Sequence, residues 1–324
     1  MNLFEFSVII PTFNREKQLI NILKNLKSQL NNKYKIEIII CDSYSDYNKK
    51  IFPKQKYNFK IKYININENI LAKKRNFGIK LSKYKYIILL DDDCIPDRNF
   101  LKEYHKSFIE IKPNSILSGI VDYPIKYLKK SNYIKYRNSK HFKYTDHKNY
   151  YNNYLPANKI VAMNMGFINS SAMKKLGYFN EKFIGYGFED FEFGYRYNKF
   201  GYKLIKTRAR IIHDEGAPNL EKYLNKFFHL GRDGMKNLIL INKNSAKKTT
   251  YNKLENNLIF KIITKMPKLE FLLLNIEKIL LVFEKFQNIY LPYLYDFLRT
   301  LSYTRGFLNR DKKKLKPNNR DWYE

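Results

Sequence analysis

The sequence predicts an α/β fold: a mostly parallel sheet flanked by helices, followed by a helical C-terminal region. Three observations support this prediction. In the first half of the chain, short apolar runs of strand type alternate with segments whose apolar residues recur at helical spacing. These runs are apolar without interruption, as expected of strands that are covered on both faces. From about Ala217 onward the pattern changes to helices alone.

The elements follow one another with polar turns between them. Strands are predicted at Phe6–Ile10, Ile36–Ile40, Ile61–Ile66, Tyr86–Leu90 and Lys203–Ile212, and helices at Leu19–Leu30, Leu71–Leu81, Leu269–Phe283 and Leu291–Leu301. The segment Tyr123–Tyr154 is rich in Tyr and Lys and weakly periodic, so we expect a long, partly mobile excursion. Apolar character returns over Ile160–Ile168, and the charged tail from Arg310 is expected to fray. We expect a catalytic domain over residues 1–216 and a helical region over residues 217–324.

Composition narrows the functional classes. The chain has 324 residues, is 44% apolar and carries a formal net charge of +31. Such a charge suits nucleic acid, an anionic membrane or an anionic substrate, but abundant Lys, Asn, Ile, Tyr and Phe are also typical of AT-rich codons. The sequence shows no N-terminal signal and no apolar run long enough to span a membrane. Its two cysteines, Cys41 and Cys94, have no metal-ligand spacing and are expected to be core thiols in a cytoplasmic protein.

Three consecutive carboxylates, Asp91–Asp93, follow a buried strand directly. Ligands in such sheets bind beyond the carboxyl ends of the strands. The carboxylates would raise one another's pKa unless a cation is present, and Mn²⁺ or Mg²⁺ prefers oxygen ligands. Since residues i and i+2 of an extended segment point the same way, Asp91 and Asp93 are the expected metal ligands. The alternative is a solvated acidic turn that caps a helix near Asn99.

Four motifs resemble those of the family-2 glycosyltransferases of GT-A fold. They are SVIIPTFNR, CDSYSD, LAKKRNFGI and LLDDDCIP, in the family's order, with Cys41 in place of the first acid of the second motif. Further on, GYGFEDFEFGYRYNKFGY is similar to the acceptor-side motif of galactosyltransferase and chondroitin-polymerase-type enzymes, and IIHDEG is similar to a segment that supplies a metal-binding His. The resemblance covers about Phe6–Gly216.

The resemblance and the residue chemistry imply roles for individual side chains. Asp93, Asp91 and His213 would hold Mn²⁺ or Mg²⁺, Asp190 would be the catalytic base, and Glu189 would orient the acceptor. The nucleotide-sugar donor, expected to be UDP-linked, would be bound by Pro11, Thr12, Phe13, Asn14, Arg15, Asp42, Arg75, Asp91, Asp92 and Gly166. Asp42 would contact the base, Asp92 the ribose, and Arg75 the nucleotide. One base opposite the leaving group would invert the anomeric centre.

Plainer interpretations stay open for the same residues. Glu189 and Asp190 could simply begin a helix, where acids suit the dipole, and Gly185 and Gly187 could only permit a tight turn. His213 could be a packed strand-end residue. Arg75 could be solvated on its helix, and Asp42 could cap a turn.

Other functions remain as alternatives. A basic nucleic-acid-binding protein would leave both acidic clusters unexplained, which argues against nucleic acid as the partner. A sugar nucleotidyltransferase would need a Gly-rich loop after the first strand, where PTFNR has none. A glycosidase with paired carboxylates would not need a nucleotide pocket at strand ends. The dinucleotide and Lys-bearing phosphate-loop motifs are absent from the sequence.

The resemblance also implies a biological setting. It points to transfer of a Gal, GalNAc, GlcNAc or Glc type of sugar to a glycan or lipid-linked oligosaccharide during bacterial capsule or lipo-oligosaccharide assembly. The C-terminal apolar stripes with interspersed Lys favour core or partner contacts. They also suit peripheral docking on the anionic inner membrane surface.

Overall fold

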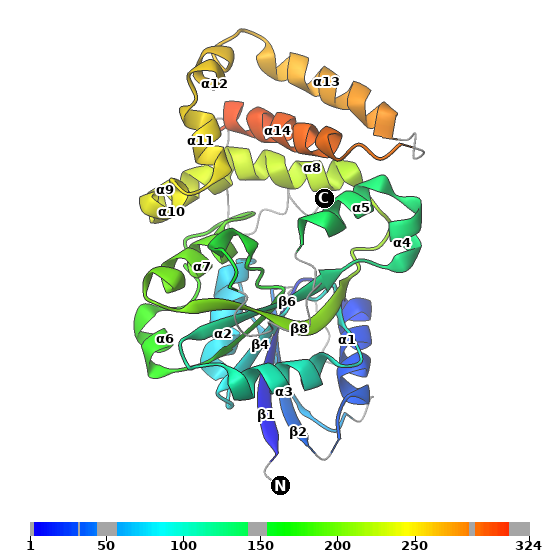
Figure 1. Ribbon diagram of the computed structural model, residues 1–324, viewed down its shortest axis with the longest axis vertical. Helices are drawn as coiled ribbons and strands as arrows, with labels where there is room; N and C mark the ends of the chain where they lie inside the picture. The colour runs from blue at the N-terminus through cyan, green and yellow to red at the C-terminus, as the bar shows by residue number, and fades with distance from the viewer. Residues whose placement is uncertain (1–2, 32, 44–56, 142–153, 285–288, 311–324) are drawn as a thin grey trace. The chain divides into compact units, whose positions relative to one another are not determined.

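The computed structural model describes residues 3–31, 33–43, 57–141, 154–284 and 289–310 (Figure 1). The chain divides into two compact units. The first contains Met1–Tyr123, His141–Glu181 and Phe193–Glu215. The second contains Pro124–Lys140, Lys182–Glu192 and the chain from Gly216 onward. Two segments within the predicted catalytic domain therefore group with the C-terminal helices, while the functions assigned to the two regions stay predictions.

The first unit is built on an eight-stranded sheet with the strand order β3-β2-β1-β4-β7-β6-β8-β5. The strands are β1 Phe4–Thr12, β2 Tyr34–Asp42, β3 Lys60–Asn65, β4 Tyr86–Leu90, β5 Cys94–Pro96, β6 Ser115–Asp122, β7 Asn164–Ile168 and β8 Lys203–His213. Strands β3, β2, β1 and β4 are parallel, and so are β6 and β8. Strand β7 is antiparallel to β4 and β6, and β5 is antiparallel to β8. The sheet is therefore mixed, and the α/β class predicted from the sequence is confirmed.

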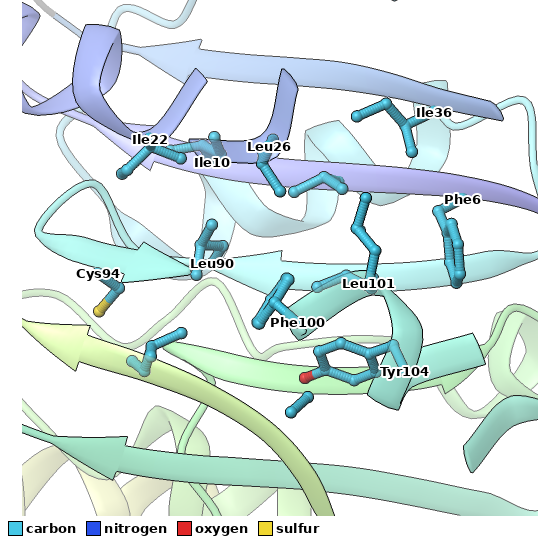
Figure 2. Close-up of a cluster of buried hydrophobic side chains, with 14 of the residues drawn as sticks. Phe6, Ile10, Ile22, Leu26, Ile36, Leu90, Cys94, Phe100, Leu101 and Tyr104 are labelled. Atoms are coloured by element: carbon cyan, nitrogen blue, oxygen red, sulfur yellow. The ribbon is translucent and has the colours of Figure 1, made fainter. Parts of the chain in front are cut away.

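Helices cover both faces of the parallel strands, which explains their uninterrupted apolar sequences. On one face, Phe6 and Ile10 of β1 pack with helices α1 (Glu16–Ser28) and α3 (Phe100–Glu110) in the largest core cluster (Figure 2). On the other face lies α2, Leu71–Leu81. A Cβ at Gly78 of α2 would lie 2.4 Å from Cγ2 of Ile9, so only glycine lets this helix pack so closely on β1.

The segment Tyr123–Tyr154 is more regular than the sequence predicts. It contains helices α4, Ile125–Lys130, and α5, Asn132–Lys140, which its weak periodicity did not predict. The rest of that prediction, residues 142–153, lies outside the described residues, as does the tail beyond Arg310. The remaining described elements before β8 are η1 (Ala157–Lys159), α6 (Ser171–Leu176) and α7 (Glu189–Lys199).

The second unit is helical from Leu220 onward, as predicted. Its elements are α8 Leu220–His229, the π-helix η2 Leu230–Gly234, α9 Met235–Ile241, α10 Lys243–Ala246, α11 Thr250–Asn256, α12 Leu258–Ile263, α13 Leu269–Glu284 and α14 Pro292–Leu308. Helix α14 packs against both α8 and α13 (Figure 1). A Cβ at Gly306 would lie 1.9 Å from the backbone oxygen of Phe228, so this glycine allows α14 to cross α8 at backbone distance. Within the described part of the chain, none of the helices has the length and apolarity to cross a bilayer.

Candidate active site

The candidate site lies between β1 and β4, where the strand order of the sheet reverses its direction. Strands β1 and β4 are parallel neighbours, and the chain leaves β1 toward β2 on one side and reaches β4 on the other. In open α/β sheets, ligands bind outside the carboxyl ends of strands at such a reversal. Thr12 ends β1, and Asp91 directly follows β4. The two motifs that the sequence predicts to form one crevice therefore end at the same edge of the sheet.

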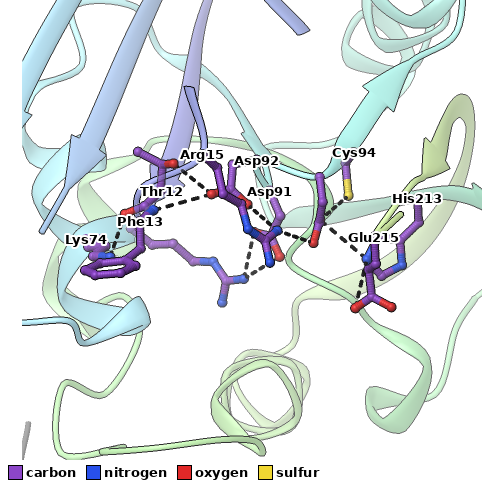
Figure 3. A network of polar contacts seen from close by, with 11 residues as sticks. Thr12, Phe13, Arg15, Lys74, Asp91, Asp92, Cys94, His213 and Glu215 are labelled. Carbon is purple, nitrogen blue, oxygen red and sulfur yellow. Dashed lines mark hydrogen bonds and ion pairs between the residues drawn. The ribbon is translucent and has the colours of Figure 1, made fainter. Parts of the chain in front are cut away.

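Asp92 joins these two strand ends through hydrogen bonds (Figure 3). Its Oδ2 accepts a hydrogen bond from Oγ1 of Thr12 at 2.7 Å, and its Oδ1 accepts one from Nη1 of Arg15 at 2.9 Å. Asp92 is only 8% exposed. Burial and the neighbouring carboxylates of Asp93 and Asp91 raise its pKa to about 7, although Arg15 and Thr12 oppose this shift.

The turn after β1 has the backbone that brings Arg15 to the acids. Asn14 has a φ of 50°, in the left-handed region that Asn tolerates better than most residues. Nη1 of Arg15 contacts both Oδ1 of Asp92 and Oδ2 of Asp93, the latter at 2.7 Å. The guanidinium therefore shares its charge between two adjacent carboxylates.

Asp93, Cys94 and His213 form a group of potential metal ligands. Their ligand atoms all lie within 4.8 Å of one another. The group exists because β5 pairs with the end of β8, with Cys94 directly opposite His213. Nε2 of His213 lies 3.4 Å from Oδ1 of Asp93 and 3.7 Å from Oε1 of Glu215. The carboxylates of Asp93 and Glu215 therefore both lie near Nε2 of His213, and Sγ of Cys94 contacts Oδ1 of Asp93 at 3.4 Å (Figure 3).

Within this group the carboxyl of Asp93 is ionised and the thiol of Cys94 is neutral. Burial disfavours the charged form of Asp93, but His213 and Arg15 outweigh it and hold the pKa of this carboxyl well below its usual range. Burial, together with Asp93, raises the pKa of the Cys94 thiol well above its usual range, so the thiol is neutral. Nδ1 of His213 is buried without a hydrogen-bond partner among the described residues.

The donor set fits a divalent cation. A carboxylate, an imidazole and a second carboxylate at Glu215 suit Mn²⁺, while Mg²⁺ prefers oxygen ligands alone. Asp91 lies outside the group, and its carboxylate contacts Nη2 of Arg75 at 3.1 Å. The role of Asp91 as a metal ligand therefore stays a prediction.

Two plainer interpretations from the sequence are wrong. Asp92 and Asp93 are largely buried and paired, and the N-terminal residue Asn99 of α3 has no side-chain cap, so the acids are not a solvated capping turn. Arg75 is 1% exposed and stacks on the ring of Phe179 at 5.3 Å, so it is not a solvated helix residue.

Other predicted nucleotide contacts have structural partners. Oδ2 of Asp42 accepts a hydrogen bond from the hydroxyl of Tyr63 at 2.5 Å. Gly166 lies in the middle of β7, and a Cβ there would come within 2.5 Å of the Tyr104 ring. Packing thus accounts for this glycine. The proposed contacts of Asp42 and Gly166 with the nucleotide remain predictions.

Sequence reasoning missed three side chains at this site. Cys94 and Glu215 were not assigned to the metal group, and Lys74 was not singled out. Nζ of Lys74 donates to the backbone oxygen of Thr12 and to Oδ1 of Asn69, both at 2.7 Å. Burial lowers the pKa of Lys74 to about 8. Its place within LAKKRNFGI could have indicated a role at the site. This motif forms most of α2, which lies against β1.

The predicted base and its neighbour belong to the second unit. Glu189 and Asp190 begin α7, where their charges suit the helix dipole. Three residues just before them have positive φ values, namely 88° at Gly185, 98° at Gly187 and 71° at Phe188. A bulky residue such as Phe rarely adopts this conformation, so the packing around it must enforce it.

The π-helix η2 and α9 supply that packing. A Cβ at Gly187 would lie 2.4 Å from Cδ1 of Leu230, and one at Gly234 would lie 2.9 Å from the backbone oxygen of Tyr186. Nδ2 of Asn237 donates to the backbone oxygen of Ile184 at 3.1 Å. The C-terminal helices therefore hold the loop that carries the predicted base.

Comparison with known proteins identifies the family of this chain. A family model described as glycosyl transferase family 2 matches residues 7–176, more than half of the 324-residue chain. A chondroitin synthase from Escherichia coli is 26% identical over 250 residues, covering 66% of this chain and 35% of that protein. The poly(ribitol-phosphate) beta-N-acetylglucosaminyltransferase TarS from Staphylococcus aureus is 28% identical over 124 residues, covering 35% of this chain and 22% of that protein. The chain thus spans about a third or less of the length of these relatives.

Solved structures show the same fold. The mannosyltransferase PcManGT from Pyrobaculum calidifontis, in complex with GDP-Man and Mn²⁺, has a TM-score of 0.57 at 12% identity, covering 95% of this chain and 88% of that one. GalNAc-T7 with UDP, GalNAc and Mn²⁺ has a TM-score of 0.51 at 14% identity, covering 82% and 58%. The sheet, the strand-end acids and the family match lead to one conclusion: the chain belongs to glycosyl transferase family 2 and has the GT-A fold.

Proposed function

We propose that this enzyme transfers a sugar of Gal, GalNAc, GlcNAc or Glc type from a UDP-linked donor to a glycan hydroxyl, with inversion of the anomeric centre. The observation that carries the proposal is the convergence of Asp93 and His213 beside Arg15, at the carboxyl ends of β1 and β4. A departing diphosphate needs its growing negative charge neutralised, and this edge of the sheet combines a cation site with basic side chains.

The choice of UDP rests on relatives. The chondroitin synthases and the beta-N-acetylglucosaminyltransferase TarS match this chain in sequence. GalNAc-T7, which shares the fold, was solved with UDP and GalNAc. PcManGT shares the fold and was solved with GDP-Man, so the fold alone does not select the base. We therefore take UDP as the donor nucleotide from the resemblance of the sequence motifs, with the GalNAc-T7 complex in support.

Asp93 and His213 would hold a Mn²⁺ or Mg²⁺ ion, with Glu215 and Cys94 at its side. When bound, such an ion stabilises charge on the departing diphosphate oxygens. The imidazole favours Mn²⁺ over Mg²⁺. Arg15 keeps Asp93 ionised and in place through its 2.7 Å contact. In this proposal Asp91 becomes an additional ligand when its carboxylate leaves Arg75 and binds the ion.

The nucleotide is fixed by residues at the other strand ends. Asp42 at the end of β2 would contact the base edge, and Asp92 the ribose hydroxyls. Lys74 holds the backbone of Thr12 in place, which orders the turn Pro11–Arg15 that faces the donor. Arg75 would orient the diphosphate. Its guanidinium stacks on the ring of Phe179, and this contact fixes the direction of the Arg75 side chain.

Asp190 would accept the proton of the attacking hydroxyl, and Glu189 would orient the acceptor. Proton removal by a positioned carboxylate is worth about 10²- to 10⁴-fold in rate. A single base that acts opposite the leaving group gives in-line displacement, which inverts the anomeric centre. The new glycosidic bond forms as the bond to the diphosphate breaks.

The acceptor proposed is a growing glycan or a lipid-linked oligosaccharide of bacterial surface polysaccharide synthesis, such as capsule or lipo-oligosaccharide. The relatives named as chondroitin synthases and as a poly(ribitol-phosphate) glycosyltransferase support a polymer acceptor. Nucleotide sugars are cytoplasmic metabolites, so we place the reaction in the cytoplasm, at the inner membrane surface where such acceptors are built.

A donor-hydrolysis panel tests the proposal. Purified enzyme is incubated with UDP-Gal, UDP-GalNAc, UDP-GlcNAc, UDP-Glc and GDP-Man, in Mn²⁺, in Mg²⁺ and in excess EDTA, and released nucleotide is measured. We expect one UDP-sugar to be hydrolysed preferentially in Mn²⁺ and none in EDTA. Undiminished hydrolysis in EDTA would exclude the metal, and preference for GDP-Man would exclude the UDP assignment.

A further inference from the structure

Among the described residues, exposed apolar side chains follow one another along α12 and α13 of the second unit. They are Ile259, Ile262, Ile263, Met266, Phe271, Leu272 and Ile279, with Leu258 and Val282 at the two ends. We call these residues the α12–α13 face. Ile259 is 65% exposed, Ile262 59% and Phe271 67%. Single exposed apolar residues are ordinary, but so many within one stretch of 25 residues, 258–282, indicate a contact surface.

Helix α13 carries large apolar side chains both toward α14 and away from it, which is the stronger observation. One side packs on α14, where Leu269, Leu273 and Leu301 form a buried cluster. The side away from this cluster carries Phe271, Leu272, Ile279 and Val282, together with the polar residues Asn275 and Lys278. Large apolar side chains that stay exposed on one side of a helix in this way indicate a contact surface. Among the described residues α14 covers only the inner side of α13.

The charges on this stretch are sorted by direction. Every exposed charged residue between 258 and 282 is a lysine, namely Lys261, Lys265, Lys268 and Lys278. Both acids of the stretch are paired, and Glu277 is buried while Glu270 is partly buried. Oε1 of Glu270 accepts a hydrogen bond from Asn309 at 2.7 Å, and Oε2 of Glu277 pairs with Nη1 of Arg305 at 2.9 Å. The outer side of α12 and α13 is therefore apolar and positively charged, with no exposed acid.

We propose that the α12–α13 face docks on an anionic lipid bilayer surface. Exposed Ile, Leu, Met and Phe side chains would enter the boundary between headgroups and acyl chains, and the four lysines would reach anionic headgroups. Lysine stems lie along apolar surface while the ammonium remains in the polar layer. The pairing of Glu270 with Asn309 and of Glu277 with Arg305 weakens the repulsion that these acids would meet at such a surface.

A second copy of the chain fits the same face less well. Face-to-face pairing would bring the lysines of one molecule near those of the other, without exposed acids in this stretch to match them. The formal net charge of +31 opposes association further. An anionic bilayer supplies both the apolar layer and the opposite charge.

Vesicle flotation with the full chain tests the inference. We expect the protein to float with vesicles that contain phosphatidylglycerol, and not with vesicles of phosphatidylcholine alone. Replacing Ile259, Ile262 and Phe271 together by Ser should lower the affinity for anionic vesicles at least about tenfold, because apolar burial is lost. Replacing Lys261, Lys265 and Lys268 by Gln should lower it about a hundredfold, since each lysine near the surface is worth roughly fivefold.

Matched controls separate vesicle binding through this face from nonspecific binding through other exposed charged and apolar residues. Ile109→Ser with Phe200→Ser changes exposed apolar residues of the first unit, and Lys17→Gln, Lys24→Gln and Lys102→Gln removes the same number of exposed lysines there. These controls should bind vesicles as the wild type does. Equal losses in controls and face variants, or no flotation of the wild type, would overturn the proposal. So would concentration-dependent dimerisation in analytical ultracentrifugation that the Ile259, Ile262 and Phe271 changes abolish.

The inference rests on the proposed function only for the membrane location of the acceptor. Flotation is measured without donor or acceptor, so its result is independent of the transfer chemistry. Donor hydrolysis in solution should be the same in the face variants and the wild type, and thermal unfolding confirms that each variant is folded. If hydrolysis fails while flotation succeeds, the proposed function is wrong and the docking surface is retained.

Discussion

Asp93 and His213 lie far apart in the sequence, yet Nε2 of His213 is 3.4 Å from Oδ1 of Asp93 in the fold. If they hold the cation, His213→Ala should weaken Mn²⁺ binding at least about tenfold, because an imidazole ligand is lost. Isothermal titration of Mn²⁺ in the presence of UDP measures this directly. His105→Ala is the matched control, since His105 packs on Phe4 instead. Equal Mn²⁺ affinity in the wild type and His213→Ala would remove His213 from the ligand set.

The role proposed for Asp190 predicts a separation of binding from turnover. Asp190→Asn keeps the shape of the side chain but cannot accept the proton, so the transfer rate should fall about 10²- to 10⁴-fold. UDP affinity, measured by titration, should be unchanged. Glu221→Gln removes an exposed acid of α8 and should leave both quantities as they are. Transfer by Asp190→Asn at close to the wild-type rate would mean that another group is the base.

Lys74 predicts a pH dependence of stability. Burial lowers its pKa in the folded chain to about 8, from 10.5 when unfolded. Between these values the unfolded chain binds more protons, so the free energy of unfolding gains from Lys74 as pH rises from 8 to 10.5. Relative to Lys74→Met, the wild type should gain about 3 kcal/mol across this window. Chemical denaturation of both proteins at several pH values measures the difference. A constant difference would show that the amine titrates normally.

The side chains that could be predicted from the sequence are those next to a strand end. Asp91–Asp93 follow an apolar run directly, so their position needed only the rule that ligands bind at carboxyl ends of strands. Cys94 could not be placed in this way. Its neighbour His213 is brought opposite by the antiparallel β5–β8 pair, and strand pairing between distant segments is not written in local periodicity. The shared pairing of Arg15 with Asp92 and Asp93 was hidden for the same reason.

At the scale of elements, the loop before α7 depends on the π-helix η2. In Gly234→Ala the new Cβ would meet the backbone oxygen of Tyr186 at 2.9 Å and Cδ1 of Leu230 at 3.0 Å. We expect the loop to shift and turnover to fall about ten- to a hundredfold, as displaced catalytic groups do. The Kd for UDP should not change. Steady-state kinetics and UDP titration measure the two effects.

Leu240→Ala on the exposed side of α9 is the control for this change, and it should leave turnover as in the wild type. Thermal unfolding shows whether Gly234→Ala remains folded. A folded Gly234→Ala with normal turnover would mean that η2 does not position the loop for catalysis.

The elements with strong periodicity were predictable and the short ones were not. Helix α2 begins and ends where its apolar spacing predicts, at Leu71 and Leu81. Helices α4 and α5 were missed because they are short and their Tyr- and Lys-rich sequences give no clear apolar stripe. The sequence predicted a mostly parallel sheet, but the sheet is mixed. Local sequence does not give the direction of β7, because this direction depends on its partners β4 and β6.

At the scale of the whole molecule, the net charge of +31 should lower stability at low ionic strength. Like charges repel one another in the compact state, and salt screens this repulsion. We expect the Tm to rise when NaCl is raised from low to moderate concentration, by about 2–4 °C for each kcal/mol of repulsion removed. Differential scanning calorimetry measures the change. A Tm that falls with NaCl would indicate that ion pairs outweigh the repulsion.

The membership of Pro124–Lys140 and Lys182–Glu192 in the second unit has a consequence for engineering. A chimera joined at Gly216 alone would transplant the helices and leave behind the acids that they support. If the second unit contacts the acceptor, as we propose, an exchange of acceptor preference between family members requires three separate stretches of polypeptide to be grafted together.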